Sequence, residues 1–462
     1  MSFLPKKLTL ALFMGCLGLA LACGGGGGGS TSTLPAPAVS ISVTPGTATL
    51  LTGATQQFTA TVANSSNTSV TWTVQEGASG GSIDSTGLFT AAPAVNGASV
   101  TVHVAATAVA DTSKSATATM TLNARTYQGT WSTAASPVVQ RLYGHALTLL
   151  KDGRVLMTGG LIATPYSIVD SCEIFDPTTN TWAETGKMSV PRRDHTATLL
   201  PNGKVLVAGG SPITGGNGFM TSAEIFDPAT GSWVATGSMS TKRETGSAHL
   251  LPSGKVLVVA GYASDAEVYD PAAGAWSAAG SLGQPYLTGN QTMALSDGRV
   301  VVAGGTTSTT VLANAKLYNP ATNTMTDIAP MSETRTFLQG VALLNGKVLV
   351  CGGSYLNGST YVPRATAEVF DPATGAWTAT GSMISFHSFA HSALLSNGRL
   401  LVFGGSDNAG NKSEIFDPAT GTWNATGTTG GSRMWGRAIR LKDGKVLVAG
   451  GNPSNPYAEI YQ

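Results

Sequence analysis

Short apolar runs recur along most of this chain, and the way they alternate with polar residues divides it into two regions. Between Val39 and Ala124, apolar and polar residues take turns, as in Val70-Thr-Trp-Thr-Val74, which is typical of half-buried strands. Beyond Ala124 the runs are apolar throughout, as in Lys204-Val-Leu-Val-Ala208, which indicates strands covered on both faces. Both regions predict strands, so the chain is expected to be all-β.

The second region is a unit of about 50 residues that repeats up to the C-terminus. Each copy has a Gly-Lys or Gly-Arg step, an apolar run and a closing glycine pair (Ala-Gly in the third copy). The seven copies of this signature are Gly153–Gly160, Gly203–Gly210, Gly254–Gly261, Gly298–Gly305, Gly346–Gly353, Gly398–Gly405 and Gly444–Gly451. Four strands are predicted in each copy, and four-stranded sheets repeated radially form a propeller in which neighbouring blades bury each other.

The glycine pair, a Glu-Ile-Phe-Asp-Pro strand and a Trp six to nine residues later resemble the kelch repeat. The resemblance covers residues 125–462 and implies a seven-bladed kelch-type propeller. The first three strands of the unit occur seven times, but only six fourth strands follow a third strand. The missing strand is found at the front, in residues 127–133, so we expect this N-terminal strand to complete the last blade.

Residues 39–124 read as a β-sandwich in which Trp72 is the expected core aromatic. The segments Ser42-Val-Thr-Pro45, Gln57-Phe-Thr-Ala60 and Asp84-Ser-Thr-Gly-Leu-Phe-Thr-Ala91 resemble the group 2 bacterial Ig-like domain. Members of that family act in adhesion or as spacers, and a spacer is expected here.

The N-terminus resembles a bacterial lipoprotein signal. Lys6-Lys7 precede an apolar stretch that ends at Ala22, and Cys23 follows it. The resemblance implies a signal peptide over residues 1–22, a lipid on Cys23 and a Gly/Ser/Pro-rich tether over residues 23–38. The expected location is the bacterial cell envelope, anchored to the outer membrane or cell surface. Ordinary cleavage near Ala22, with release of the protein, is the alternative.

Composition narrows the function classes. Only 11% of the residues are charged and the net charge is +1, so the chain lacks the basic surface of a nucleic-acid-binding protein. Cys172 and Cys351 occupy different positions of the unit and are expected to be buried free thiols. No Cys/His metal spacing occurs, so neither a metal nor a cofactor is expected. A monomer is expected.

Antiparallel strands place two kinds of connection on two faces of the ring. One face carries uniform Asn/Asp-Gly turns and reads as scaffold, whereas the other carries loops of variable length, where such folds place binding residues. Aromatic rings on that face suit sugar rings or peptide side chains, and packing in the channel or between blades is the alternative. The candidate ligand-binding residues are Trp435, Tyr143, Tyr286, Phe337, Phe386, Phe389 and Arg433.

Basic residues recur in the same loops, at Arg141, Arg192, Arg243, Arg335, His387 and Arg433. They form either a basic ring that attracts an anion or internal pairs with a Glu that recurs in the third strand. The fourth unit loses both partners, with Lys316 in place of Glu and Tyr286-Leu287 in place of the basic residue. Joint loss favours pairing within each blade.

The enzyme best known for a similar ring is galactose oxidase, whose copper-radical chemistry uses two tyrosines, two histidines and a cysteine crosslinked to a tyrosine. This chain has no Tyr-His dipeptide, and its cysteines fall on regular strand positions. Acidic residues near the variable face show no distinctive pairing in the sequence; they are Asp170, Asp194, Glu244, Asp265 and Asp407. The sequence therefore favours a surface-anchored, non-catalytic protein that binds polysaccharide or another envelope protein. An extracytoplasmic carbohydrate-active enzyme is the alternative.

Overall fold

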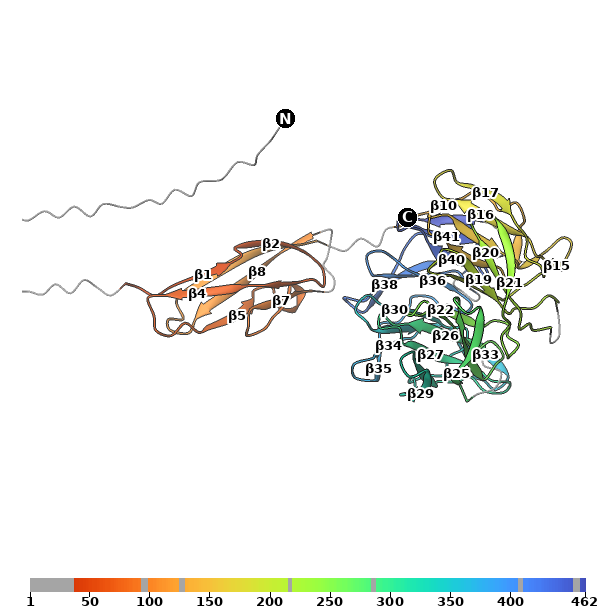
Figure 1. Cartoon of the computed structure of the whole chain (residues 1–462). Coiled ribbons are helices and arrows are strands. Elements are labelled where there is room, and N and C mark those ends of the chain that lie inside the picture. The colour runs from red at the N-terminus through yellow and green to blue at the C-terminus, as the bar shows by residue number, and fades with distance from the viewer. Residues whose placement is uncertain are drawn as a thin grey trace, which may run out of the picture. The chain divides into compact units, whose positions relative to one another are not determined.

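The computed structural model describes residues 37–92, 99–123, 129–214, 218–283, 288–405, 410–451 and 458–462. The described chain is all-β and forms two compact units (Figure 1). The proposed signal peptide, Cys23, most of the tether and Tyr286 lie outside the described residues. Within those residues, no helix is long and apolar enough to cross a membrane.

The first unit is a sandwich of short antiparallel strands. One sheet runs in the order β2 (Thr47–Leu51), β9 (Ser115–Asn123), β8 (Ser99–Ala108) and β5 (Val70–Val74). The facing strands are β1 (Ser40–Thr44), β4 (Thr59–Ala63), β3 (Thr55–Gln57), β7 (Leu88–Ala91) and β6 (Gly81–Ile83). Phe58 and Phe89 are fully buried, and their ring centroids lie 6.4 Å apart. Trp72 is half-buried and packs against Phe58 at 6.5 Å, so it flanks the core centre.

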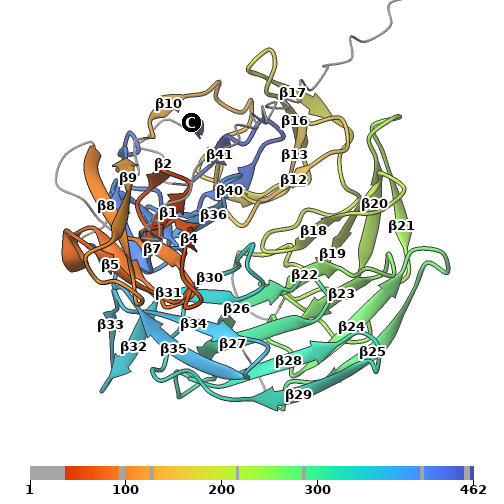
Figure 2. The same ribbon diagram turned by 90° about the vertical axis from the view of Figure 1, so that its left-hand side faces the viewer.

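The second unit is a seven-bladed propeller of four-stranded antiparallel sheets, whose ring is visible in Figure 2. The strands of each blade are given from the inner to the outer one. Blade 1 consists of β12 (Ala146–Leu149), β13 (Val155–Thr158), β16 (Cys172–Asp176) and β17 (Thr181–Thr185), and blade 2 of β18 (Thr196–Leu199), β19 (Val205–Ala208), β20 (Ala223–Asp227) and β21 (Ser232–Thr236). Blade 3 consists of β22 (Ser247–Leu250), β23 (Val256–Val259), β24 (Asp265–Asp270) and β25 (Ala275–Ser281).

Blades 4 to 6 follow the same plan. Blade 4 consists of β26 (Thr288–Ala294), β27 (Val300–Thr306), β28 (Ala315–Asn319) and β29 (Thr324–Ile328). Blade 5 consists of β30 (Gln339–Ala342), β31 (Val348–Cys351), β34 (Ala367–Asp371) and β35 (Ala376–Thr380). Blade 6 consists of β36 (His391–Leu394), β37 (Leu400–Phe403), β38 (Ser413–Asp417) and β39 (Thr422–Ala425). Outside the blades lie β11 (Arg141–Tyr143), β14 (Leu161–Ile162), β15 (Ser167–Ile168) and the hairpin of β32 (Ser354–Asn357) and β33 (Thr360–Pro363).

Blade 7 joins the two ends of the ring. Its inner strands are β40 (Arg437–Arg440), β41 (Val446–Ala449) and β42 (Ala458–Tyr461), and its outer strand is β10 (Trp131–Thr133). β10 runs antiparallel to β42, with Trp131 opposite Tyr461. The Trp131 ring also lies 4.6 Å from that of Phe403 in blade 6, so the N-terminal strand packs on two blades.

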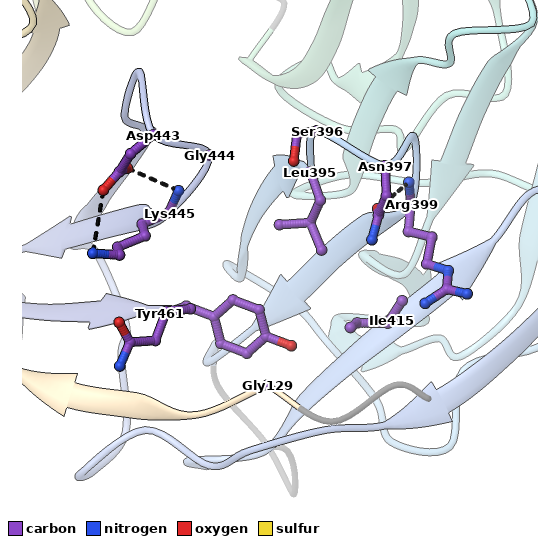
Figure 3. A pocket seen from close by; sticks show the side chains of 11 residues that line it. Gly129, Leu395, Ser396, Asn397, Arg399, Ile415, Asp443, Gly444, Lys445 and Tyr461 are labelled. Atoms are coloured by element: carbon purple, nitrogen blue, oxygen red, sulfur yellow. Dashed lines mark hydrogen bonds and ion pairs between the residues drawn. The ribbon is translucent and has the colours of Figure 1, made fainter. Parts of the chain in front are cut away.

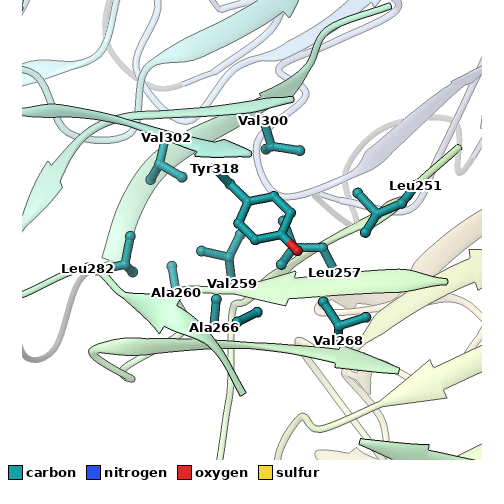
Figure 4. Close-up of a cluster of buried hydrophobic side chains, with 11 residues drawn as sticks. Leu251, Leu257, Val259, Ala260, Ala266, Val268, Leu282, Val300, Val302 and Tyr318 are labelled. Atoms are coloured by element: carbon teal, nitrogen blue, oxygen red, sulfur yellow. The ribbon is translucent and has the colours of Figure 1, made fainter. Parts of the chain in front are cut away.

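The apolar second strand of each blade is buried on both sides because each side faces a different neighbour. In blade 4, Val300 and Val302 pack against blade 3, as Figure 4 shows, while Val301 and Ala303 pack against blade 5. Burial of each such valine stabilises the fold by about 1.5–3 kcal/mol. This arrangement explains why the second strand of the repeat does not alternate.

The recurring Trp of the outer strand links adjacent blades. The Trp233 ring packs at a tilt against Phe226 of its own blade, with ring centroids 5.0 Å apart, and its indole N–H donates to the carbonyl oxygen of Gly186 in the previous blade at 2.8 Å. Trp276 repeats the bond with Gly237 at 2.7 Å. Blade 4 carries Met325 at this position, which cannot donate such a bond.

Candidate functional site

The inner strands of the seven blades surround the central channel, and each contacts its neighbour around the ring (Figure 2). At the entry to each inner strand lies a residue with a positive φ angle. In six blades it lies two positions before the residue that pairs with the last residue of the second strand. In blade 4 the second strand continues to Thr306, and Gly289 lies two positions before Gln291, the partner of Ala303. We call these seven residues the mouth ring: Gly144 (74°), Asp194 (53°), Thr245 (59°), Gly289 (64°), Phe337 (54°), Phe389 (55°) and Trp435 (64°).

Main-chain hydrogen bonds between blades explain this left-handed backbone. The N–H of Asp194 donates to the carbonyl oxygen of Gly144 at 2.7 Å, and the N–H of Thr245 donates to Asp194 at 2.9 Å. The N–H of Phe337 likewise donates to Gly289 at 2.7 Å. A positive φ turns the peptide toward the neighbouring blade, so the conformation belongs to the scaffold.

The residue types in the mouth ring do not follow from the backbone alone. Glycine adopts a positive φ without steric cost and occupies two of the seven positions, whereas an L-residue pays about 1–2 kcal/mol there. Phe337, Phe389 and Trp435 carry this cost in three consecutive blades. Bulky residues in this region are outliers, and such strain concentrates at ligand-binding sites.

A second ring lies two residues further on, at the first residue of the inner strand in six blades and at Gln291 within β26 in blade 4. Blades 1 to 3 carry small residues here, and blades 4 to 7 carry long polar ones. In blade order the residues are Ala146, Thr196, Ser247, Gln291, Gln339, His391 and Arg437. The sevenfold pattern of the repeat is therefore broken in the same half of the channel mouth in both rings.

The large residues of the two rings enclose a pocket of about 260 Å³. Phe337, Phe389 and Trp435 form aromatic walls, and the polar side chains of the second ring line it beside them. The complete lining is Gly289, Gln291, Phe337, Leu338, Gln339, Phe389, Ala390, His391, Trp435 and Arg437. We call this cavity the mouth pocket.

Aromatic rings continue on both sides of the mouth pocket. Phe337 and Phe389 stack at 4.0 Å, and Tyr361 of the β32–β33 hairpin meets Phe337 edge-on at 6.2 Å. On the other side Tyr143 lies 5.8 Å from Trp435. Tyr361 and Trp435 are about half exposed, at 50% and 47%. We call these five residues the aromatic crescent.

The polar lining offers both hydrogen-bond donors and an acceptor. The guanidinium of Arg437 is 42% exposed and its nearest carboxylate, Asp194, lies 3.9 Å away. His391 is buried, and its Nε2 has no hydrogen-bond partner among the described residues. Burial and then the charges of Arg437 and Arg433 lower the pKa of His391 to about 3, so the imidazole is neutral near pH 7.

A charged cluster lies in the loops of blades 2 and 3. Nη1 of Arg193 lies 2.7 Å from Oδ2 of Asp194 and 2.5 Å from Oε1 of Glu244. The guanidinium of Arg193 is the ionic partner of Glu244 Oε1, although the geometry between the two groups is not that of a hydrogen bond. Burial raises the pKa of Glu244 to about 7; the charge of Arg193 opposes the shift and that of Asp194 adds to it. Tyr262 stacks on Phe219 at 4.9 Å beside the cluster, and its pKa is raised by burial and then by Glu244.

The structure separates the sequence candidates. Trp435, Phe337 and Phe389 meet in the mouth pocket, and Tyr143 flanks it. Phe386 is 41% exposed but does not line the pocket. Sequence reasoning missed Gln291, Gln339, His391, Arg437 and Tyr361. The available signal for the first four was their common offset from the glycine pair.

Arg433 belongs to the interior, because its side chain is fully buried and its Nε lies 2.9 Å from Oε2 of Glu459. The predicted pairing within blades is confirmed in six blades. The pairs are Arg141–Glu173, Arg192–Glu224 (3.0 Å), Arg243–Glu267 (3.2 Å), Arg335–Glu368 (3.2 Å), His387–Glu414 (3.2 Å) and Arg433–Glu459 (2.5 Å). Each glutamate also accepts backbone N–H groups of its loop, as Glu224 does from Ser189 at 2.8 Å. These residues fix the loops and are not free to bind an anion.

Larger cavities lie between blades, away from the mouth. Figure 3 shows one of about 380 Å³ between blades 6 and 7, and similar grooves of about 400 and 440 Å³ lie between blades 7 and 1 and blades 5 and 6. Charged side chains in the first are paired, Lys445 with Asp443 at 3.2 Å and Arg399 with Asp417 at 3.1 Å. Because these grooves recur with the blades, they are features of the scaffold.

Comparison with known proteins supports both domains. The family profile of the bacterial Ig-like domain (group 2) matches residues 37–120, and that of the kelch motif matches residues 335–384. These matches confirm the two resemblances and their order. No curated protein sequence matches the chain.

Solved structures share the fold. One is described as a novel fungal alcohol oxidase of the AA5 family in complex with copper. It is 17% identical, the match covers 72% of this chain and 76% of that one, and the TM-score is 0.57. Another, YjhT, is 15% identical over 64% of this chain and 99% of its own, with a TM-score of 0.50. At these identities the likeness establishes the propeller fold alone.

The residues of this chain do not fit a copper centre. In the part of the chain that the structure describes, no group of three or more His, Cys, Asp or Glu side chains is placed to hold a metal. Cys172 and Cys351 are buried free thiols whose pKa is raised to about 12 by burial. His387 contacts Glu414, and the mouth pocket contributes the single imidazole of His391.

Proposed function

We propose that this protein binds polysaccharide, without catalysis, through the mouth pocket and the aromatic crescent of its propeller. The observation that carries the proposal is the convergence of Phe337, Phe389 and Trp435 on one pocket from positions where their backbone is strained. Glycine would remove that cost, as it does at Gly144 and Gly289. Retention of three rings is therefore best explained by what the rings bind.

Sugar rings match this site chemically. The apolar face of a pyranose stacks on an aromatic ring, while its hydroxyl groups need nearby donors and acceptors. Arg437, Gln291 and Gln339 supply donors beside the aromatic walls. The aromatic crescent extends past the pocket to Tyr361 and Tyr143, so adjoining residues of a longer chain also meet rings.

The proposal places the protein on the bacterial cell envelope. A lipid on Cys23 would anchor the chain, and residues 23–38 and the Ig-like domain would act as tether and spacer. An envelope protein that inserts aromatic or aliphatic side chains at the mouth is the other ligand compatible with the same rings.

The charged cluster gives the enzyme alternative specific support, because a carboxyl group with a pKa near 7 can act as a general acid. The side chain of Glu244 is only 5% exposed, and Arg193 binds both it and Asp194. A general acid must touch the leaving-group oxygen. Glu244 is buried and engaged, so the geometry favours binding over hydrolysis.

A glycan array probed with the full-length protein and its Trp435→Ala variant tests the proposal. Val234→Ala is the matched control, because Val234 is 65% exposed on β21, outside the mouth pocket. We expect Trp435→Ala to weaken glycan binding at least tenfold and Val234→Ala to leave it unchanged. Binding of no glycan, or equal binding by wild type and Trp435→Ala, would refute a carbohydrate site at the mouth; retained binding to an envelope-protein extract would then identify the other ligand.

A further inference from the structure

His391 is the one residue of the mouth pocket whose polar atom is both buried and unused. His391 starts the inner strand of blade 6, and its side chain is nine-tenths buried and lines the pocket with Phe389 and Trp435. Its Nε2 has no hydrogen-bond partner among the described residues. Buried polar atoms are nearly always paired, so an unpaired one in a residue that lines a cavity indicates a missing partner.

The tautomer of His391 follows from its other ring nitrogen. A hydrogen bond between the ring and the backbone of Arg433 raises the pKa, so it runs from a ring N–H to a carbonyl oxygen. Because Nε2 is the unpartnered nitrogen, that N–H is on Nδ1. In a neutral imidazole the second nitrogen then carries a lone pair and can only accept.

The surroundings keep the ring in this neutral state. Arg437 lines the same pocket and Arg433 supplies the neighbouring backbone, and both guanidinium groups disfavour a second positive charge on His391. The remaining polar side chains of the lining, Gln291 and Gln339, are uncharged. The pocket therefore presents donors from Arg437 and the amides and one fixed acceptor at its buried end.

We propose that His391 is the specificity-determining residue of the mouth pocket and that its Nε2 accepts a hydrogen bond from one hydroxyl of a terminal pyranose. The inference rests on the proposed carbohydrate-binding function. At about 260 Å³ the mouth pocket is smaller than the usual 300–1,000 Å³ of sites for larger ligands, so it holds one sugar ring. A hydroxyl matches because it donates to Nε2 and still accepts from Arg437.

Selectivity follows from the cost of leaving Nε2 unpaired. A site built to bond a substrate hydroxyl rejects the analogue that lacks it, because desolvated groups of the protein then lose their partner. One deoxy analogue should therefore bind about tenfold more weakly than its parent, and the other deoxy analogues should bind nearly as well.

The test uses methyl glycosides of glucose, galactose and mannose and their monodeoxy analogues, titrated into the full-length protein by calorimetry. His391→Leu removes the acceptor, and His391→Gln keeps a polar group of similar reach. We expect one deoxy analogue to lose about tenfold in wild type, to match its parent in His391→Leu, and to be discriminated again in part by His391→Gln. Trp435→Ala should weaken every glycoside alike.

A readout on the wild-type protein keeps the test independent of how the variants fold. In ¹⁵N-histidine-labelled protein, the Nε2 resonance of His391 should report an unprotonated nitrogen and shift when the preferred glycoside binds. Glycoside binding with an unmoved Nε2 and no deoxy discrimination would overturn the role of His391 and leave the proposed function standing. Failure of all glycosides to bind, in wild type and variants, would overturn both.

Discussion

Replacement of Trp435 by glycine and by alanine separates the strain of the mouth ring from its role in binding. Trp435 has φ +64°, equal to that of Gly289 and close to the +74° of Gly144 at equivalent positions. An alanine there keeps the Cβ and pays about 1–2 kcal/mol for the left-handed backbone. Glycine avoids this cost but loses about 0.5–1 kcal/mol through the greater freedom of the unfolded chain.

The difference leaves Trp435→Gly more stable than Trp435→Ala by about 0.5–1 kcal/mol. This order is the reverse of the one found in regular strands. Val234 provides that comparison, because it is exposed on β21 and is absent from the residues with positive φ. There the glycine variant should be the less stable by about 0.5–1 kcal/mol.

Scanning calorimetry of the four variants measures the effect as a shift of about 1–2 °C in the propeller transition. Glycan binding is measured on the same samples and should fall equally in Trp435→Gly and Trp435→Ala, because both lack the ring. Stability and binding would then move independently. If Trp435→Ala were the more stable of the pair, the reasoning on backbone strain would be wrong, and the aromatic residues of the mouth ring would need another explanation.

Two further predictions concern the charged groups. Arg192→Met breaks the buried pair with Glu224 and should lower the free energy of unfolding by about 3–5 kcal/mol without changing glycan affinity. Arg192→Met combined with Glu224→Gln should recover part of the lost stability. A binding defect at unchanged stability would contradict the structural role of the pair. Glu244 has an ordinary pKa of 4.5 and a folded-state pKa raised to about 7 by burial, so between these values the folded protein binds more protons than the unfolded one and stability falls as the pH rises. Denaturation from pH 4.5 to 8 should show this fall in wild type and a smaller one in Glu244→Gln, and identical pH profiles would refute it.

The sequence repeat predicted most of the fold. The glycine pair, the outer Trp and the paired basic and Glu positions recur in register, and the Trp and the pairs correspond to contacts that recur in the blades other than blade 4. The site was harder to predict because it depends on φ angles and on which blades face one pocket. Phe337, Phe389 and Trp435 were found as aromatic outliers, but their strain became visible only beside Gly144 and Gly289.

Polar residues of the site had no such signal. Arg433 and Arg437 are both arginines near the start of blade 7, yet one is buried against Glu459 and the other lines the mouth pocket. The sequence distinguishes them only by their offset from Gly450-Gly451, which sets whether a side chain enters the blade or the channel. His391 had no signal either, because its ring is hydrogen-bonded to the backbone of Arg433 in the loop that enters the neighbouring blade.

Main-chain hydrogen bonds join neighbouring positions of the mouth ring, as from Asp194 to Gly144 and from Phe337 to Gly289. Side chains at its seven positions, and at the seven positions two residues further on, can therefore change without altering the bonds that hold the blades together. In the proposed function, ligand choice would depend on two residues per blade, separately from the residues that hold the ring together. Exchange of one repeat for another by recombination would move both residues of a blade together to a new position at the mouth. New ligand specificities could then arise without new contacts between blades.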